Sequence, residues 1–380
     1  MLSANNNEFK IDKTITYLNH AAVGVWPQST RDAVCQFADE NLHVGAANYP
    51  KWMQVETALR AQFQKLLNAA SSDDIALVKN TSEALSFVAY GLPWREGDEV
   101  VTLAEEFPSN RVVWESLADK GVTTRQISLS ENWSAPEEAL IAAMSDRTRL
   151  LSVSSVQYAS GFQLDLHMLG EACKQRGILF CVDAIQSLGV VPIDVQAINA
   201  DFVMADGHKW MLGPEGVAVF YSHPDARDKL SLTQYGWHML EHMHDFDNPE
   251  WHPATSARRF ECGSPNMLGI HALHASLELL LETGIENIHQ SILTHARRLH
   301  EIIHAHPALQ LLSSDTPDRY AGIVTFAVEG QDQNHVYQSL MSNKVICALR
   351  GGGIRFSPHF YTPENKLTHA FDVLEDIISS

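Results

Sequence analysis

The sequence has few cysteines, few basic residues and no long apolar run. Its five cysteines are an odd number without a close pair, so they indicate neither a disulfide framework nor a zinc knuckle. No stretch approaches the ~20 consecutive apolar residues that cross a bilayer. The first residues, MLSANNNEFKID, lack the basic segment and following apolar run of a secretory signal. We therefore expect a cytoplasmic protein without membrane contact.

Positive charge is scarce as well. The 380 residues include 27 Lys and Arg against 46 Asp and Glu, which gives a formal net charge of −19. This excess repels nucleic acids and anionic membranes, so a phosphate-bearing partner needs a local pocket of hydrogen-bond donors. The composition argues against a nucleic-acid-binding protein but not against a small phosphorylated cofactor.

Short apolar runs alternate with helical patterns from residue 51 onward. The strand-like runs are IALVKN, EVVTLA, VTTRQISL, TRLLSVSSV, ILFCVD, DFVMAD and GVAVFY. Strands that alternate with helices predict an α/β fold with a mainly parallel sheet covered by helices on both faces. The near-continuous apolar runs ILFCV and VAVFY are typical of strands buried on both sides.

The pattern changes near residue 266. The elements predicted beyond it are helices at 267–283 and 286–305, the strand-like run AGIVTFAV, and helices near 332–341 and 363–378. The turn-rich tripeptide GSP before them favours a domain boundary. We predict a large domain over 17–265 and a smaller α+β domain over 266–380, joined by residues 1–16.

The residues that follow the strands are the candidates for chemistry, because ligands of open parallel sheets bind beyond the carboxyl ends of the strands. Asp183 follows ILFCV, where a carboxylate is costly unless a cation or donors meet it. Lys209 lies in a Gly-rich turn after DFVMA, where partial burial favours the reactive neutral amine. Thr81 and Ser82 begin a helix, whose N-terminus can bind phosphate. Together these residues predict a site for pyridoxal 5′-phosphate (PLP).

Several segments of the chain resemble one family in its order from residue 17 to 365. They are YLNHAAVGVWP, NTSEALSFVAYGL, EEFPSNRVVW, VDAIQSLGVVPIDV, ADGHKWMLGPEG, RFECGSPN and IRFSPHFYTPEN. The chain resembles the class V aminotransferases, in the branch of the cysteine desulfurases and selenocysteine lyases. This resemblance implies PLP as the cofactor and the fold type I architecture, with a large cofactor domain and a small C-terminal domain.

The resemblance also implies roles for the residues around the cofactor. Lys209 resembles the Schiff-base lysine, which then moves the α-proton of the substrate. Asp183 resembles the carboxylate that pairs with the pyridine nitrogen, and Gln186 the residue that reaches the ring hydroxyl. Thr81 and Ser82 resemble the hydroxyl pair at the phosphate, a role compatible with plain helix capping.

Four further positions near the cofactor follow the family less closely. His208 resembles the histidine on the phosphate side, and Gln157 lies near the residue beside the ring oxygen. Phe107 replaces the histidine that lies over the ring in desulfurases, so it can stack but not transfer a proton. Asp206 replaces a serine that donates to the phosphate in many relatives, and an ionised carboxylate cannot donate.

The substrate and the neighbouring subunit have candidates of their own. Arg355 resembles the arginine that binds the substrate carboxylate, with Arg350 as a second candidate. His20 lies on the N-terminal loop that approaches the substrate in relatives. Ser264 resembles the hydroxyl that reaches the phosphate of the other subunit, which implies a homodimer with a shared active site.

Histidines at 238, 242 and 244 offer metal-ligand atoms, but the HExxH arrangement is absent. We read them as a solvated or core-facing group and expect no metal.

The sulfur-carrying cysteine of the desulfurases has no counterpart at its expected place. In relatives it lies on a loop between two arginines, whereas here only residues 351–354 separate Arg350 from Arg355. Cys347 falls in the apolar run KVICAL, where a thiol is usually inert. We therefore expect an aminotransferase acting on a small amino acid. A β-lyase of the selenocysteine lyase or desulfurase type, a racemase on the same scaffold, and a non-catalytic scaffold protein are the alternatives.

Overall fold

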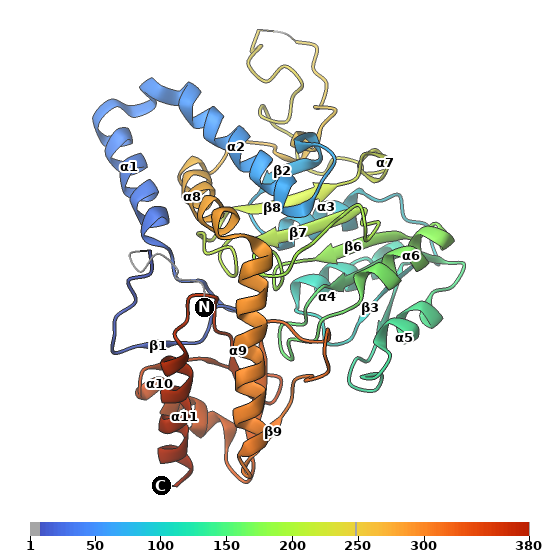
Figure 1. The fold of residues 1–380 in the computed structure, drawn as a ribbon. Helices are drawn as coiled ribbons and strands as arrows, with labels where there is room; N and C mark the ends of the chain where they lie inside the picture. The colour runs from blue at the N-terminus through green and yellow to red at the C-terminus, as the bar shows by residue number, and fades with distance from the viewer. Residues whose placement is uncertain (1–7, 248, 380) are drawn as a thin grey trace.

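The computed structural model describes residues 8–247 and 249–379, and Figure 1 shows how its sheets and helices are arranged. The largest sheet has seven strands in the order β2-β8-β7-β6-β5-β3-β4. Their bounds are β2 Ile75–Val78, β3 Glu99–Leu103, β4 Thr123–Ile127, β5 Thr148–Ser154, β6 Leu179–Asp183, β7 Phe202–Asp206 and β8 Ala218–Ser222. Neighbouring strands are parallel except where they pair with β8. The predicted α/β fold with a mainly parallel sheet is confirmed.

β8 runs antiparallel because its connection from β7 is short. Residues 207–217 join the two strands, whereas a parallel crossover takes roughly a dozen residues or more and usually a helix. The chain therefore turns back, and β8 pairs antiparallel with both β7 and β2. This short connection holds Lys209 directly against the carboxyl end of β7.

Helices cover both faces of the large sheet (Figure 1). They include α3 Thr81–Gly91, α4 Ser109–Glu115, α5 Pro136–Ala143, α6 Leu166–Arg176 and α7 Pro224–Arg227. The side chain of Asn80 caps α3 by accepting the Glu83 N–H. Helix α4 is followed by the short 3-10 helix η3, Ala118–Lys120. Gly121 ends η3 with a φ of 76°, a conformation that glycine adopts without strain.

A group of helices packs beside the β2 edge of the sheet. They are α1 Gln28–Val44, η1 Gly45–Asn48, α2 Tyr49–Leu67 and α8 Met267–Thr283, with the short η2 Ser72–Asp74 and η4 Ala257–Phe260 near β2. Helix α8 packs against α1 and α2, although it follows the boundary predicted at residue 266. The two domain ranges stay a prediction.

The C-terminal part holds a second, antiparallel sheet in the order β12-β13-β10-β9. Its elements are α9 Ile285–Ala305, β9 Leu309–Leu311, β10 Val324–Val328, α10 Gln333–Ser342, β12 Ala348–Arg350, β13 Gly353–Phe356 and α11 Glu364–Ile378. The strand β1 (Thr16–Tyr17) pairs with β11 (Val345–Ile346), so the N-terminal segment joins this part of the molecule.

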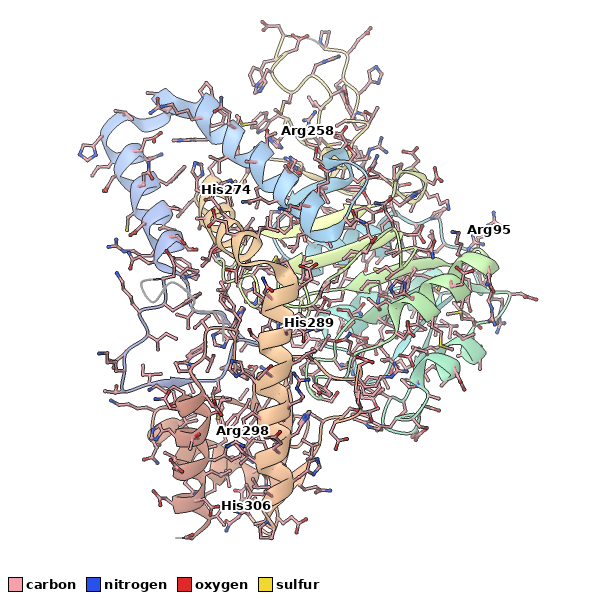
Figure 2. All side chains as sticks on the ribbon, in the orientation of Figure 1. Arg95, Arg258, His274, His289, Arg298 and His306 are labelled. Atoms are coloured by element: carbon pink, nitrogen blue, oxygen red, sulfur yellow. The ribbon has the colours of Figure 1, made fainter. Side chains whose placement is uncertain are left out.

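Helix α9 contacts both the large part and the C-terminal part of the molecule, and Figure 2 labels His289 on this helix and His306 at its end. His289 Nδ1 lies 3.0 Å from the Val190 carbonyl oxygen in the large part. His306, just beyond the end of α9, pairs with Glu375 of α11 at 2.7 Å. Across 8–247 and 249–379, no helix is both long enough and apolar enough to cross a bilayer.

Candidate active site

Lys209 and Asp183 lie side by side at the carboxyl edge of the large sheet. β6 ends at Asp183, and the adjacent parallel strand β7 leads into the turn that carries Lys209. Only 8% of Lys209 and 2% of Asp183 is exposed. Burial lowers the pKa of Lys209 to about 8, although the Asp183 charge opposes this shift. The pair therefore combines an amine that loses its proton readily with a nearby carboxylate.

Burial raises the pKa of Asp183 to about 7. The Ile185 N–H donates to its carboxylate at 3.0 Å and favours the charged form. The neighbouring carboxylate of Glu106 acts in the opposite direction and favours protonation. A positive charge placed beside Asp183, such as a protonated ring nitrogen, would hold it ionised.

A chain of contacts joins Lys209 to Arg355. Lys209 Nζ lies 5.5 Å from the centroid of the Phe107 ring. Phe107 in turn meets the Tyr158 ring edge to face, at 5.2 Å between centroids and 80° between planes. Arg355 Nη1 donates to the Tyr158 carbonyl oxygen at 2.7 Å. The predicted substrate arginine and the predicted cofactor lysine are thus brought to one place.

Arg355 is only 2% exposed, yet it has no ion pair with a carboxylate in the described part of the chain. Its Nη2 lies 3.5 Å from Asn19 Oδ1, and its Nε has no partner. Burial lowers its pKa to about 10, and the second predicted arginine, Arg350, adds to this effect. Arg350 itself is exposed and donates to the Leu349 carbonyl oxygen. Such a guanidinium is suited to receive a carboxylate from a ligand.

Glu106 is a site residue that the sequence reasoning missed. It is 4% exposed and follows β3, and burial raises its pKa. It accepts the Ser154 N–H at 2.8 Å, the Ser154 hydroxyl, and the Gln157 side-chain N–H at 2.9 Å. The signal was the acidic pair in EEFPSN directly after a buried strand. Because Glu106 binds the amide nitrogen of Gln157, the Gln157 Oε1 is left buried and without a partner.

Gln186 has both ends of its side chain engaged by the protein. Its amide nitrogen donates to the Ala21 carbonyl oxygen at 3.0 Å, and its Oε1 accepts the Trp210 indole N–H at 2.8 Å. One amide N–H remains for the predicted contact with a ring hydroxyl. Gln186 therefore links Ala21 of the N-terminal loop to Trp210, the residue next to Lys209.

His20 is completely buried, and burial lowers its pKa to about 4. Its Nδ1 lies 2.9 Å from the Ser357 carbonyl oxygen, and its Nε2 lies 2.6 Å from the Tyr361 hydroxyl. The carbonyl can only accept, so Nδ1 carries the proton and Nε2 accepts from the tyrosine. No ring nitrogen is left for a substrate, and the geometry speaks against the predicted substrate contact of His20.

The first turn of α3 offers the predicted phosphate donors. Thr81 is 5% exposed, and its Oγ1 has no hydrogen-bond partner in residues 8–247 and 249–379. The exposed Ser82 hydroxyl donates to the Ser109 hydroxyl oxygen at 2.8 Å. An unsatisfied buried hydroxyl at a helix N-terminus is an arrangement that a phosphate can complete.

Asp206 and His208 face each other beside Lys209. Asp206 Oδ1 lies 3.0 Å from His208 Nδ1, without the alignment of a hydrogen bond. The Asp206 carboxylate favours protonation of both Asp183 and Lys209.

Ser264 is exposed after η4 and lines a hollow of about 180 Å³ with residues at the start of α3. Its predicted contact with a second subunit stays a prediction.

The histidines of the predicted solvated or core-facing group lie in two places, with His238 in the interior and His242 and His244 at one hollow. His238 is buried near Glu56 and Glu261, the one cluster among the described residues with metal-site geometry. Arg60 pairs with both carboxylates, so the cluster already contains a cation. His242 and His244 line a shallow hollow with Arg258, which Figure 2 labels at the base of a long loop.

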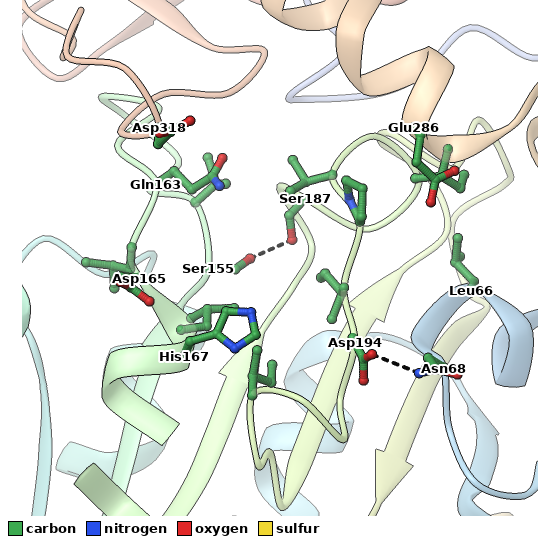
Figure 3. Close-up of a pocket in the computed structure, with 18 of the residues that line it drawn as sticks. Leu66, Asn68, Ser155, Gln163, Asp165, His167, Ser187, Asp194, Glu286 and Asp318 are labelled. Carbon is green, nitrogen blue, oxygen red and sulfur yellow. Dashed lines mark hydrogen bonds between the residues drawn. The ribbon is translucent and has the colours of Figure 1, made fainter. Parts of the chain in front are cut away.

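A large cavity lies elsewhere in the molecule. Figure 3 shows this space of about 1080 Å³, with Asp165 and His167 at one side and Glu286 at the other. None of the predicted site residues lines it. Two of its buried hydroxyls, those of Ser155 and Ser187, are hydrogen-bonded to each other. The candidate active site is therefore placed by its residues, at Lys209 and Asp183, and not by this cavity.

Known proteins resemble the chain over nearly its whole length. The chain is 30% identical over 360 residues to an uncharacterized aminotransferase, YcbU, of Bacillus subtilis, with 95% of this chain and 94% of that protein covered. It is 29% identical over 382 residues to a probable cysteine desulfurase of Methanothermobacter thermautotrophicus, with 95% and 94% covered.

Two solved structures of C-DES share the fold. One is a lysine mutant with glycine covalently linked to the PLP cofactor, and the other is the cystine C–S lyase in complex with its product, cysteine persulfide. Both have a TM-score of 0.88 at 22% and 23% identity, and cover 95% of this chain and 97% and 98% of theirs. The family of class V aminotransferases matches residues 16–359, and this protein belongs to that family of PLP-dependent enzymes.

Proposed function

We propose that this protein cleaves the carbon–sulfur bond of a cysteine-like amino acid by β-elimination. The observation that carries the proposal is the state of Cys347, the thiol nearest in sequence to Arg355 and Arg350. It is 1% exposed, and burial raises its pKa to about 12. A thiol of this kind is not a nucleophile at neutral pH, so it cannot take sulfur from a substrate.

The residues around Lys209 fit PLP. The buried amine of Lys209, the Asp183 carboxylate beside it and the unpartnered hydroxyl of Thr81 correspond to the aldehyde, ring nitrogen and phosphate of that cofactor. When bound, PLP supplies an electron sink for the pair of electrons left at the substrate α-carbon.

The chain's own groups then have distinct tasks. Arg355 binds the substrate carboxylate in its buried, unpaired position and so fixes the orientation of the α-carbon. Lys209, with its lowered pKa, takes the α-proton near neutral pH. Asp183 would stabilise the positive charge of a protonated ring nitrogen at the carboxyl edge of the sheet. The burial of Lys209 and Arg355 keeps most water from the reacting atoms.

The buried, inert thiol of Cys347 selects between two ways of breaking the bond. Transfer of sulfur to the enzyme, which gives alanine, needs a thiolate. Elimination needs only a base and a leaving group: RS–CH2–CH(NH3⁺)–COO⁻ and water give RSH, pyruvate and ammonium. The names of the relatives, a probable desulfurase and a cystine C–S lyase, support a sulfur-bearing substrate.

Amino transfer, the first expectation from the sequence, is the second candidate. It is favoured by the relative of 30% identity that carries an aminotransferase name. Amino transfer uses the same base, Lys209, and the same carboxylate-binding arginine, Arg355, so the reaction products distinguish it from elimination.

The test is to incubate the holoenzyme with cystine and S-substituted cysteines, then measure pyruvate, ammonium and free thiol. Equal amounts of the three support elimination. Alanine would indicate sulfur transfer, a second keto acid consumed in equal amount would indicate amino transfer, and an inverted enantiomer would indicate racemisation. Lys209→Ala is the control and should abolish both turnover and the absorbance of the attached cofactor.

A further inference from the structure

Tyr158 lies between the two ends of the candidate site, although nothing in the sequence motifs singled it out. Its ring contacts Phe107, which lies over the Lys209 amine. Its backbone carbonyl accepts from Arg355, and its phenol is close enough to the guanidinium to interact with it electrostatically. The side chain is half-buried. Tyr158 is therefore held by neighbours that the proposed function already uses.

In the described part of the chain, the Tyr158 hydroxyl forms no hydrogen bond that would stabilise the fold. No hydrogen bond joins it to another group among residues 8–247 and 249–379, whereas the main chain of the same residue is fixed by Arg355. A phenol with a free hydroxyl can donate a hydrogen bond or a proton.

The other polar groups near Lys209 are less able to give a proton. Phe107 has none to give, and both ring nitrogens of His20 are paired with protein atoms. The Glu106 carboxylate accepts donors from Ser154 and Gln157. His208 faces Asp206. Apart from Lys209, which the proposed function uses as the base, Tyr158 is the described residue in ring or cation contact with Phe107 that has a free proton donor.

We propose that Tyr158 is a further catalytic residue, which donates its proton to the sulfur that leaves the substrate. This step rests on the proposed β-elimination. The carbon–sulfur bond breaks, its electron pair leaves with sulfur, and the phenol proton moves to that sulfur. The tyrosinate then recovers the proton that Lys209 took from the α-carbon, by way of solvent. In sum, one proton passes from the α-carbon to the sulfur, so Lys209 and Tyr158 return to their starting protonation states.

General acid catalysis matters most when the leaving group is strongly basic. An alkyl thiolate gains much from a proton donor, whereas an electron-poor aryl thiolate leaves easily without one. The proposal therefore predicts a dependence on the leaving group and not a uniform loss of activity.

Tyr158→Phe is a sharp test because it keeps the ring against Phe107 and the carbonyl bond to Arg355. Turnover of S-alkyl cysteines should fall about 100-fold. Turnover of S-(nitrophenyl)cysteine should change less than about threefold, and the absorbance of the bound cofactor should stay the same. Tyr235→Phe is the matched control, since it removes an exposed hydroxyl that donates to the Leu232 carbonyl oxygen outside the site.

The two classes of leaving group also separate the assignment of Tyr158 from the proposed function. An equal loss for all leaving groups, or no loss for any, overturns the assignment while pyruvate formation by the wild type still supports elimination. If the wild type forms no pyruvate from any of these substrates, the proposed function fails, and the role of Tyr158 fails with it.

Discussion

Gly24 is the point at which the N-terminal loop comes closest to the turn that carries Lys209. Its N–H donates to the His208 carbonyl oxygen at 2.6 Å. A Cβ at this position would lie 2.2 Å from the Lys209 carbonyl oxygen and 3.0 Å from Leu212 Cδ2. Because the nearest atom is backbone, no side-chain rotation can relieve the contact. We predict that Gly24→Ala displaces the loop from the Lys209 turn.

The magnitude follows from the geometry. The Cβ and the carbonyl oxygen must separate by about 1 Å to reach an ordinary contact, which costs about 1–3 kcal/mol when a packed region is overfilled. The hydrogen bond to His208 is lost with this movement, at about 0.5–1.5 kcal/mol. A total of about 1.5–4.5 kcal/mol lowers Tm by about 2–6 °C, because the entropy of unfolding reaches about 0.8 kcal/mol/K for a chain of 380 residues. The shifted lysine should also attach the cofactor less completely.

Two alanine variants separate these effects. Gly263→Ala is the control for the substitution itself, since its Cβ would meet nothing within 4 Å. Gly170→Ala is the control for instability. Gly170 lies in α6, which carries no site residue, and a Cβ there would lie 1.7 Å from the Ile198 carbonyl oxygen. Thermal unfolding and cofactor absorbance should both change in Gly24→Ala, only unfolding in Gly170→Ala, and neither in Gly263→Ala. An unchanged Tm and full cofactor loading in Gly24→Ala would refute the reasoning.

Three further predictions concern single groups. Because the neutral amine of Lys209 reacts with PLP and its pKa is lowered to about 8, the rate of cofactor capture by the apoenzyme should rise up to about pH 8 and then level off; a rise that continues past pH 10 would contradict this. Cys347→Ala should leave turnover unchanged, and iodoacetamide should label the partly exposed Cys35 before the buried Cys347; loss of activity in Cys347→Ala would restore a sulfur-transfer mechanism. Glu106→Gln should lower the free energy of unfolding by about 1–3 kcal/mol, measured in urea, because the donors from Gln157 and its neighbours lose their acceptor charge.

The elements of the fold could be predicted from local patterns. The helices predicted at 267–283 and 286–305 correspond to α8 and α9, because the spacing of apolar residues records which face is buried. The direction of β8 was not evident from its apolar run, since composition alone does not distinguish a parallel from an antiparallel strand. The short connection after β7 contained that information.

The candidate site was predictable in its residue types and less so in its contacts. Asp183 and Lys209 follow adjacent strands, so topology alone brings them together. Glu106 and Tyr158 were missed because their importance depends on contacts between segments far apart in sequence. The burial of His20 has the same origin, since its ring partners Ser357, more than 300 residues away. Pairings of this length leave no periodic signal in the sequence.

The charges around Lys209 are arranged unevenly, and this unevenness is an argument for what binds there. The carboxylates of Asp183, Asp206 and Glu106 lie on one side, and burial raises the pKa of both Asp183 and Glu106. Arg355 lies at the other end without a carboxylate partner in the described part of the chain. The carboxylate end therefore lacks a balancing positive charge, and the Arg355 end lacks a balancing negative charge. A ring with a protonated nitrogen and an amino acid with a free carboxylate, bound together, supply both, so cofactor and substrate each offset an electrostatic cost that the protein's own groups leave uncompensated.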